Sequence, residues 1–226
     1  MSNYTILICV HNEETSIPKL LKGLEHYHNN NHEILIIDDG SQDETTRLLK
    51  NCNFINVLFL KKNEGKGSAL RKGIAKAKNE KIIVFDGDLE LDSSEIEKLM
   101  ILDKKKNIYS AMGYRFKNLN PLKSNFDWGN FMFTSFFNII FKSNHKDILC
   151  CAKSFYINQR LINILSSKGF EIDVELASLL TIRNKLKGIP QISLKYNRRT
   201  IQEGKKLQIS DGWKILAKII KMTKFL

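Results

Sequence analysis

The 226-residue chain lacks the sequence features typical of disulfide-rich secreted proteins, of zinc-binding proteins and of membrane-spanning proteins. Its four cysteines, Cys9, Cys52, Cys150 and Cys151, form no Cys-x-x-Cys pair, so we expect neither a zinc site nor a disulfide framework. No run of 18 apolar residues is present, so no transmembrane helix is expected. The first residues carry no basic region before their short apolar run, and we expect no signal peptide. These absences favour a protein of the reducing cytoplasm.

The chain also lacks the glycine-rich loops that bind phosphate groups directly. No Gly-x-x-x-x-Gly-Lys-Ser/Thr sequence occurs, and Gly65-Lys66-Gly67 is too short for such a loop. The turn after the first predicted strand has no glycine and carries Glu13 and Glu14, which would repel a pyrophosphate. Dinucleotide binding is therefore disfavoured, and a diphosphate bound here would need a metal ion to mediate the contact.

Positive charge is in excess and unevenly placed. The chain has 36 Lys and Arg against 24 Asp and Glu, a net charge of +12. Residues 191–226 alone hold nine basic and two acidic residues, a net charge of +7. The expected partner is therefore anionic: a phosphorylated small molecule, an acidic membrane surface or a nucleic acid.

Apolar strand patterns alternate with helical patterns along the first half of the chain. Strands are predicted at 4–10, 33–37, 56–60, 81–85 and 109–114, with helices between them. Ser16 is the expected cap of the first helix, and a later helix is expected to end near Arg183. Such repetition predicts an α/β fold with a mostly parallel sheet and right-handed crossovers.

Carboxylates gather directly after the fourth predicted strand, in the stretch 81–92. Asp86 and Asp88 follow its apolar run and Glu90 comes two residues later, at the strand end where open α/β sheets bind ligands. Carboxylates this close repel one another unless solvated or shared by a cation. The stretch therefore predicts a Mg²⁺ or Mn²⁺ site. The alternative is a polar loop whose Asp92 or Ser93 caps the next helix.

Polar pairs follow three of the predicted strands. They are Asn12-Glu13, Asp38-Asp39 and Asp86-x-Asp88. Each alone could be an ordinary turn. Because parallel strands present their carboxyl ends at one edge of a sheet, we expect the three pairs to converge on one site.

Two segments of the second half carry unusual patterns. Residues 126–141 hold ten large apolar residues in sixteen, which indicates a core helix or, as the less favoured alternative, one lying on lipid. Residues 211–226 form a basic amphipathic pattern, with Lys214, Lys218 and Lys221 on one face and Trp213 and Ile220 towards another. This helix fits an anionic membrane surface, and an ordinary surface helix is the alternative.

Several motifs together resemble the family-2 glycosyltransferases of GT-A fold, and among them the polyprenyl-phosphate (dolichyl-phosphate) mannose and glucose synthases and their bacterial relatives. The motifs are ILICVHNEETSI, IIDDGSQDET, NEGKGSALRKGI, FDGDLEL, GFEIDVEL and YNRRTIQEGKKLQISDG. The resemblance covers nearly the whole chain. It implies one GT-A domain over 1–226, in which 1–115 bind the nucleotide sugar, 116–210 bind the acceptor and 211–226 form the basic helix.

The chain departs from the family pattern in a few places. Cys9 and His11 stand where a proline and an aromatic residue are usual, and Glu90 stands in a glutamine position. Cys151 and Ala152 replace a glycine and an aromatic residue in DILCCAKSF. No Gln-x-x-Arg-Trp motif occurs, so the resemblance does not extend to processive polysaccharide synthases.

The resemblance implies inverting transfer of a hexose from a nucleotide diphosphate sugar, of GDP-mannose or UDP-glucose type, to a polyprenyl phosphate. The enzyme would be cytoplasmic and peripheral at the inner face of the membrane, with a separate membrane protein as a further partner and no nucleic acid. The implied nucleotide-sugar residues are Val10, Asn12, Glu13, Asp38, Asp39, Gly40, Lys66, Asp86 and Gly87. The implied Mg²⁺ or Mn²⁺ ligands are Asp86, Asp88 and Glu90. The implied acceptor-phosphate residues are Arg115, Arg199, Lys205 and Lys206, and the implied catalytic residues are Asp88, Arg115 and Glu175.

Other functions stay open at this point. A hydroxyl acceptor would need a carboxylate base, and Asp147, Asp173 and Glu175 are the candidates, although Glu175 could instead orient the basic loop. A catalytically lapsed, membrane-peripheral binding subunit is an alternative of another class. A phosphatase of haloacid-dehalogenase type is disfavoured, because three strands precede its Asp-x-Asp motif and Glu90 stands where Thr or Val is expected.

Overall fold

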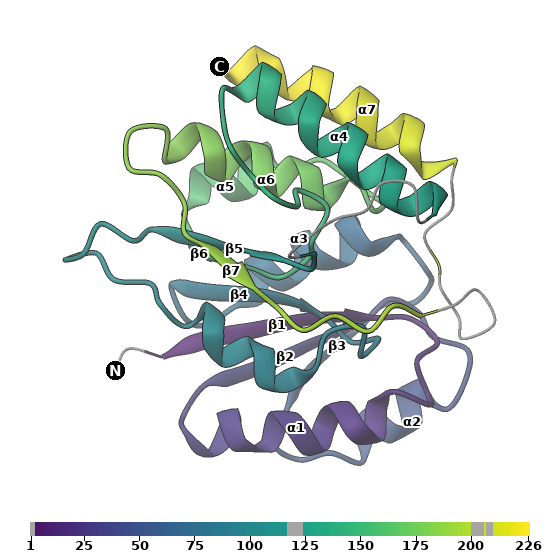
Figure 1. The fold of residues 1–226 in the computed structure, drawn as a ribbon. Coiled ribbons are helices and arrows are strands. Elements are labelled where there is room, and N and C mark those ends of the chain that lie inside the picture. Colours follow the sequence, from purple (N-terminus) through teal and green to yellow (C-terminus); the bar gives the residue numbers. More distant parts are fainter. Residues whose placement is uncertain (1–2, 117–123, 200–205, 207–209) are drawn as a thin grey trace.

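The computed structural model describes residues 3–116, 124–199, 206 and 210–226. A seven-stranded sheet in the order β3-β2-β1-β4-β6-β5-β7 runs through the molecule, with helices on both faces (Figure 1). The strands are β1 (Tyr4–Val10), β2 (Glu33–Asp38), β3 (Asn56–Phe59), β4 (Lys81–Asp86), β5 (Ser110–Tyr114), β6 (Lys153–Tyr156) and β7 (Gln191–Ser193). The GT-A fold class expected from the sequence is confirmed in this mostly parallel sheet.

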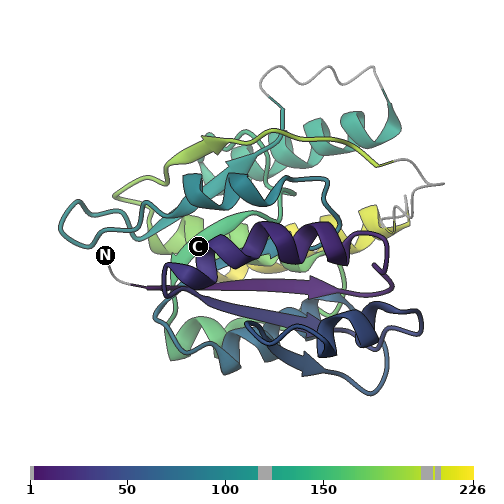
Figure 2. The same cartoon turned by 90° about the horizontal axis from the view of Figure 1, so that it is seen from below.

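The helices fall into two groups on opposite faces of the sheet. α1, α2 and the 3₁₀ helix η1 cover one face, which Figure 2 shows from below. α3, α5 and α6 cover the other, with α4 and α7 above α6 (Figure 1). The bounds are α1 (Ile17–Asn29), α2 (Thr45–Lys50), α3 (Lys66–Lys76), η1 (Ser93–Leu99), α4 (Asn125–Phe141), α5 (Gln159–Ile164), α6 (Ile172–Arg183), α7 (Asp211–Met222) and η2 (Thr223–Phe225).

The central strands are apolar on both sides because both of their faces are covered. In β4, Ile82 and Val84 pack towards α3 and α6, whereas Ile83 and Phe85 pack towards α1 and η1. All four are at most 2% exposed. Parallel strands covered by helices on both faces read as continuous apolar runs, which is why the first four strands could be located from the sequence.

The fifth predicted strand, 109–114, is present as β5, but the sequence did not indicate which strand lies beside it. β6 inserts between β4 and β5, antiparallel to both. Lys153 stands inside β6 and is completely buried, and its ammonium donates to the carbonyls of Ile148 and Cys150. A lysine in a four-residue strand hides the apolar pattern that would mark a central strand.

α4 contributes Phe137 and Phe141 to the core, as its composition favours, but only one side of the helix is buried. Its buried residues include the polar Asp127, Asn130 and Thr134. Trp128 and Ile139, by contrast, are 52% and 77% exposed. The polar residues face inwards because charged and amide groups of other segments meet them there, as described below.

α7 also presents a different face from the one its pattern suggested. It buries Ile215, Ile219 and Met222 against α6 and α4, and Lys218 is buried with them. The predicted common lysine face is wrong for Lys218, which is 8% exposed, whereas Trp213 and Ile220 are 76% and 53% exposed on the outward side of the helix. Positions three and four apart share a helix face, and α7 contains two such apolar stripes. The sequence alone does not say which of them packs.

Within the part of the chain that the structure describes, no helix combines the length and the apolar character needed to cross a membrane.

Replacing Phe137 by alanine should destabilise the fold, because its ring is fully buried in α4 and stacks on Phe141 with centroids 4.2 Å apart. We expect a loss of about 3–5 kcal/mol in the free energy of unfolding, measured by urea titration. Ile139→Ala, two residues along but 77% exposed, should change it by no more than about 0.5 kcal/mol. Equal losses in the two variants would contradict the orientation of α4 described here.

Candidate functional site

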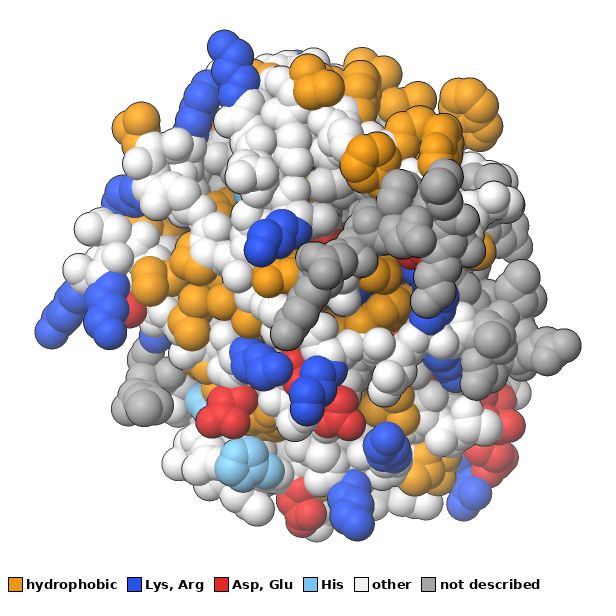
Figure 3. Space-filling view, in the orientation of Figure 1, with side chains coloured by type: hydrophobic (Ala, Val, Ile, Leu, Met, Phe, Trp, Pro, Cys, Tyr) orange, Lys and Arg blue, Asp and Glu red, His pale blue; other side chains and the backbone are white. Residues whose placement is uncertain are grey.

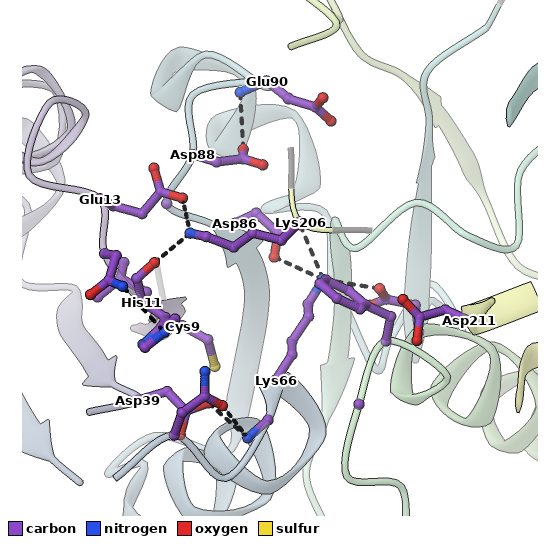
Figure 4. A pocket seen from close by; sticks show the side chains of 18 of the residues that line it. Cys9, His11, Glu13, Asp39, Lys66, Asp86, Asp88, Glu90, Lys206 and Asp211 are labelled. Atoms are coloured by element: carbon purple, nitrogen blue, oxygen red, sulfur yellow. Dashed lines mark hydrogen bonds and ion pairs between the residues drawn. The ribbon is translucent and has the colours of Figure 1, made fainter. Parts of the chain in front are cut away.

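A cavity of about 600 Å³ opens at the carboxyl edge of β1, β2 and β4 (Figure 4). The predicted convergence of three polar turns is confirmed, since residues of all three border this cavity. The predicted site residues that line it are Val10, Asn12, Glu13, Asp39, Lys66, Asp86, Gly87, Asp88, Glu90, Arg115 and Lys206.

The first two turns are joined by hydrogen bonds. The amide of Asn12 donates to Ser41 Oγ at 2.9 Å, and the Asn12 side-chain oxygen accepts from the amide of Gln42 at 2.8 Å. The Ser16 hydroxyl, expected to cap α1, instead donates to the carboxylate of Glu13 at 3.0 Å. The turn is therefore built to hold the Glu13 carboxylate in place rather than to cap the helix.

The neighbouring residues Asp38 and Asp39 accept hydrogen bonds from different groups and border different cavities. Asp38 is buried and accepts from the Ser41 amide at 2.9 Å and from Thr46 Oγ1 at 2.6 Å, so it shapes its own turn. With Gly40 it borders an adjoining cavity, which shares His11 and Asn63 with the main one. Asp39 borders the main cavity, where it accepts from the amides of Glu64 and Gly65 at 2.8 and 2.9 Å. Burial raises the pKa of Asp39, although these two amides oppose the shift.

Lys66 stands at the centre of the site, between two carboxylates. Its ammonium lies 2.9 Å from an oxygen of Asp86 and 2.9 Å from Asp173 on α6 (Figure 4 shows Lys66 and Asp86). Burial opposes the charge of Lys66, but Asp173 and Asp86 outweigh it and raise the pKa of the ammonium. Burial likewise disfavours a charged Asp86, and Lys66 overcomes this and lowers the pKa of that carboxyl. The group therefore places a fixed cation beside the Asp-x-Asp motif.

Among the described residues, Asp88 forms no ion pair comparable to that of Asp86. Burial, with the charges of Asp86 and Glu90, raises its pKa to about 7. Its carboxylate accepts from the amide of Glu90 at 3.0 Å. A crowded pair of carboxylates with unrelieved repulsion is the chemistry that a divalent cation relieves, and oxygen ligands are what Mg²⁺ and Mn²⁺ prefer. Asp86 and Asp88 thus fit a metal ion whose other ligands would come from a bound diphosphate.

Glu90 is not the third ligand that the sequence suggested. Its carboxylate accepts from Tyr196 Oη at 3.1 Å and from the amide of Arg199 at 2.9 Å. Among the described residues no three His, Cys, Asp or Glu side chains are grouped so as to hold a metal ion, which contradicts the predicted triple of Asp86, Asp88 and Glu90. Glu90 instead anchors the segment 196–199 to the loop after β4.

Arg115 borders the cavity in a fixed orientation. Its Nε and Nη2 donate to the two oxygens of Asp147 at 2.8 and 3.0 Å. Asn130 of α4 donates to the same carboxylate at 2.8 Å. Burial opposes the charge of Arg115, but Asp147 prevails and raises its pKa. This pairing accounts for one of the inward-facing polar residues of α4.

Two further cations gather on Glu13. Arg199 Nη1 lies 2.9 Å from one Glu13 oxygen, and the Lys206 ammonium pairs with the other and with the carbonyl of His11 (Figure 4). Arg199 itself is not among the residues that border the main cavity. Lys205 lies outside the described residues. Arg198, next to Arg199, pairs with Asp127 of α4.

Glu175, expected near the reacting atoms, does not border the cavity. It is 1% exposed on α6 and accepts hydrogen bonds from Ser166, Ser167 and Lys218. A direct catalytic role is therefore wrong for Glu175 in this geometry.

Some cavity residues were not anticipated as site residues. Those given no site role from the sequence are Cys9, His11, Asn63, Gly65, Leu149, Gly169, Phe170, Asp211, Lys214 and Ile215. The last three bring α7 to the rim of the cavity. Asp211 and Lys214 are paired at 3.1 Å. The amphipathic pattern of α7 was visible in the sequence, but its position beside the strand edge was not.

The profile of the family described as "Glycosyl transferase family 2" matches residues 5–162. An undecaprenyl-phosphate 4-deoxy-4-formamido-L-arabinose transferase of Proteus mirabilis is 29% identical over 130 residues, 52% of this chain and 38% of that protein. A dolichyl-phosphate beta-glucosyltransferase of Mus musculus is 30% identical over 109 residues, 42% of this chain and 34% of that protein. The chain thus spans little more than a third of the length of these relatives.

Solved structures agree on the fold. Glucosyl-3-phosphoglycerate synthase of Mycobacterium tuberculosis, in complex with phosphoglyceric acid, superimposes with a TM-score of 0.76 at 14% identity, over 99% of this chain and 80% of that one. The same enzyme has also been solved with Mn²⁺ and uridine diphosphate, at a TM-score of 0.76. With the family profile covering residues 5–162 of a chain of this fold, the protein belongs to glycosyl transferase family 2.

Proposed function

We propose that the chain transfers a hexose, with inversion, from a nucleoside diphosphate sugar to a polyprenyl phosphate at an anionic membrane surface. One observation carries the proposal: a single cavity is lined both by the Asp86-x-Asp88 carboxylates and by the cations Arg115 and Lys206. The names of the relatives from Proteus mirabilis and Mus musculus, undecaprenyl-phosphate and dolichyl-phosphate transferases, are the reason for choosing this acceptor class.

The donor would lie along the turns after β1 and β2. Asp39 and the backbone near Val10 border the part of the cavity that the nucleoside would occupy, and Glu13 flanks it. Asp86 and Asp88 would hold a divalent ion, Mg²⁺ or Mn²⁺, which neutralises the charge of a departing diphosphate. Lys66 supplies a fixed positive charge at the same point, since it already contacts Asp86 at 2.9 Å. Such preorganised charge stabilises a leaving group without rearrangement.

The acceptor would lie where Arg115 borders the cavity. A phosphate is already anionic and nucleophilic, so it needs cations to hold it rather than a general base to activate it. Arg115 suits this task because Asp147 fixes its plane, and a guanidinium can bind phosphate through two parallel hydrogen bonds. Arg199 and Lys206, gathered on Glu13, would provide further positive charge at the rim.

The outer surface of α4 and α7 supports a site at the membrane. Trp128 and Phe131 of α4 are 52% and 50% exposed, and Trp213 and Ile220 of α7 are 76% and 53% exposed. Figure 3 shows apolar side chains gathered at the upper right, over these two helices. Large contiguous apolar surfaces mark interaction sites, and exposed Trp and Phe beside lysines suit an anionic lipid interface. A separate membrane protein is the other partner that such a surface fits.

Asp88→Asn should lower sugar transfer by about 10²-fold or more, because it removes a carboxylate charge while keeping the side-chain shape. The measurement is nucleotide release from a panel of nucleoside diphosphate sugars with Mn²⁺ and a short polyprenyl phosphate. Asp92→Asn in the same loop is the control: Asp92 only caps η1, and asparagine caps equally well. Full turnover by Asp88→Asn would refute the role of Asp88. Nucleotide binding without turnover of any donor would favour the non-catalytic binding subunit.

Replacing Phe131 and Trp213 together by serine should weaken binding to vesicles containing phosphatidylglycerol by about tenfold or more, since each buries apolar area in the lipid interface. Vesicle sedimentation measures this. Leu186→Ser, at a site 99% exposed after α6, is the matched control and should bind as the wild type does. Undiminished binding by the double variant would remove the membrane role proposed for this surface.

A second candidate, transfer to a hydroxyl acceptor, is favoured by Asp173. Its side chain is 7% exposed, borders the cavity and has a buried Oδ1 with no hydrogen-bond partner among the described atoms. Asp147 and Glu175, the other two candidate bases, are fully engaged by Arg115, Asn130, Lys218 and the amides near Ser166. Asp173 is therefore the carboxylate placed to take a proton from a hydroxyl.

If a hydroxyl is the acceptor, Asp173→Asn should reduce transfer by about 10²-fold or more while the nucleoside diphosphate still binds. Assays with glycan and polyprenyl-phosphate acceptors in parallel decide between the two candidates. Transfer to a hydroxyl that persists in Asp173→Asn would exclude Asp173 as the base.

A further inference from the structure

Lys218 of α7 is buried in an ion pair that its position on an amphipathic helix did not suggest. It is 8% exposed, and its ammonium lies 2.8 Å from Glu175 of α6, which is 1% exposed. Burying two charges is costly unless they are paired and their remaining hydrogen-bonding sites are filled. Here the filling groups belong to a third segment, the turn 166–168. This pair therefore joins α7 to more than the surface of α6.

Glu175 holds the turn 166–168 in place. Its carboxylate accepts from the amides of Ser166 and Ser167 at 3.0 and 2.9 Å and from the Ser166 hydroxyl at 2.9 Å. Lys218 also contacts that hydroxyl at 3.2 Å. The lowered pKa of Glu175 agrees with this, since Lys218 and these donors overcome the effect of burial. Without the Lys218 ammonium, the Glu175 carboxylate that accepts hydrogen bonds from the turn would lose its positively charged partner.

The turn 166–168 supplies a hydrogen-bond acceptor to the N-terminus of α3. The carbonyl of Lys168 accepts from the amides of Gly67 and Ser68 at 2.8 and 3.2 Å. These amides belong to the first turn of α3, where a helix has no carbonyl partners of its own. A Cβ on Gly67 would lie 2.5 Å from the carbonyl oxygen of Ser167, so this close approach requires glycine. The start of α3 is therefore shaped by the turn that Glu175 holds.

Lys66 stands in that first turn of α3 and reaches into the cavity. It lies 2.9 Å from both Asp86 and Asp173, as described above. Direct contacts thus run from Lys218 through Glu175, the turn 166–168 and the amides of Gly67 and Ser68 to the cation beside the Asp-x-Asp motif. Lys218 itself is not among the residues that border the cavity. Any effect it has on a ligand there must pass through this series of contacts.

We propose that Lys218 is a positioning residue that links the seating of α7 to the binding of a nucleoside diphosphate in the cavity. It does so by fixing the turn 166–168 and, through it, the N-terminus of α3 and Lys66. The ligand named here rests on the proposed function. Such a linkage is reciprocal, so a ligand that orders the start of α3 also favours the seated position of α7.

The linkage predicts that Lys218→Met, which keeps the side-chain stem but removes the charge, weakens binding of UDP or GDP with Mn²⁺. We expect a dissociation constant raised at least about threefold, measured by calorimetry. In the free protein, hydrogen exchange at the amides of Gly67 and Ser68 should become faster, while exchange in α1 stays unchanged. Lys218→Arg, which retains the charge, should restore both properties at least in part. Lys221→Met, at an exposed position of the same helix, is the matched control and should behave as the wild type.

The two readouts separate the linkage from the proposed function. If the wild type binds neither UDP nor GDP, the proposed function fails, and the linkage is then tested by hydrogen exchange alone. Faster exchange at Gly67 and Ser68 in Lys218→Met supports the linkage. Unchanged exchange overturns it. If Lys218→Met does not fold, Ser166→Ala replaces it, since this removes only the hydroxyl shared by Lys218 and Glu175 and should shift both readouts in the same direction by less. Unchanged affinity and exchange in a folded variant would overturn the proposal.

Discussion

Charge compensation around Lys66 is the constraint on which the rest of the site depends. Its buried ammonium pairs with Asp86 at the end of β4 and with Asp173 at the start of α6, so it joins the carboxyl edge of the sheet to the helical layer above it. Buried charges persist only when each has a partner. Other charged residues around Lys66 are paired in the same way: Arg115 pairs with Asp147, and Glu13 pairs with two cations. Asp88, by contrast, is paired with no cation among the described residues, and it lies beside Asp86 where a metal ion fits.

Buried charges are also paired in the helical layer that covers this face of the sheet. α4 turns Asp127 and Asn130 inwards to hold Arg198 and the carboxylate that orients Arg115, and it turns Trp128 and Phe131 outwards. The first half of α4 thus has a polarity inverted relative to an ordinary surface helix, whereas its second half buries Phe137 and Phe141. Such a helix places the cations of the cavity and an apolar surface on opposite sides of one rigid element. An acceptor with a phosphate head and an apolar tail has the same division of chemistry.

Much of this arrangement could be predicted from the sequence, and the rest could not for physical reasons. Local patterns located β1 to β4 and the convergence of their acidic turns, because continuous apolar runs and strand-end carboxylates are properties of neighbouring residues. The position of β6 was missed, since buried Lys153 disguises it. The partners of Glu90 and Glu175 were missed because Tyr196 and Lys218 are far away along the chain. Which carboxylate meets which cation is decided by tertiary packing, and no local pattern records it.

The insertion of β6 between β4 and β5 has a consequence for synthesis and folding. The residues of β4 leave the ribosome well before residues 153–156, which pair with one of its edges. Until then, the central strand of the nascent sheet offers unpaired backbone groups to any other chain. Chains of this size fold through such partly assembled states, in which open strand edges promote association. Residues 1–115 therefore do not contain every strand that pairs with β4, because residues 153–156 supply its second neighbour.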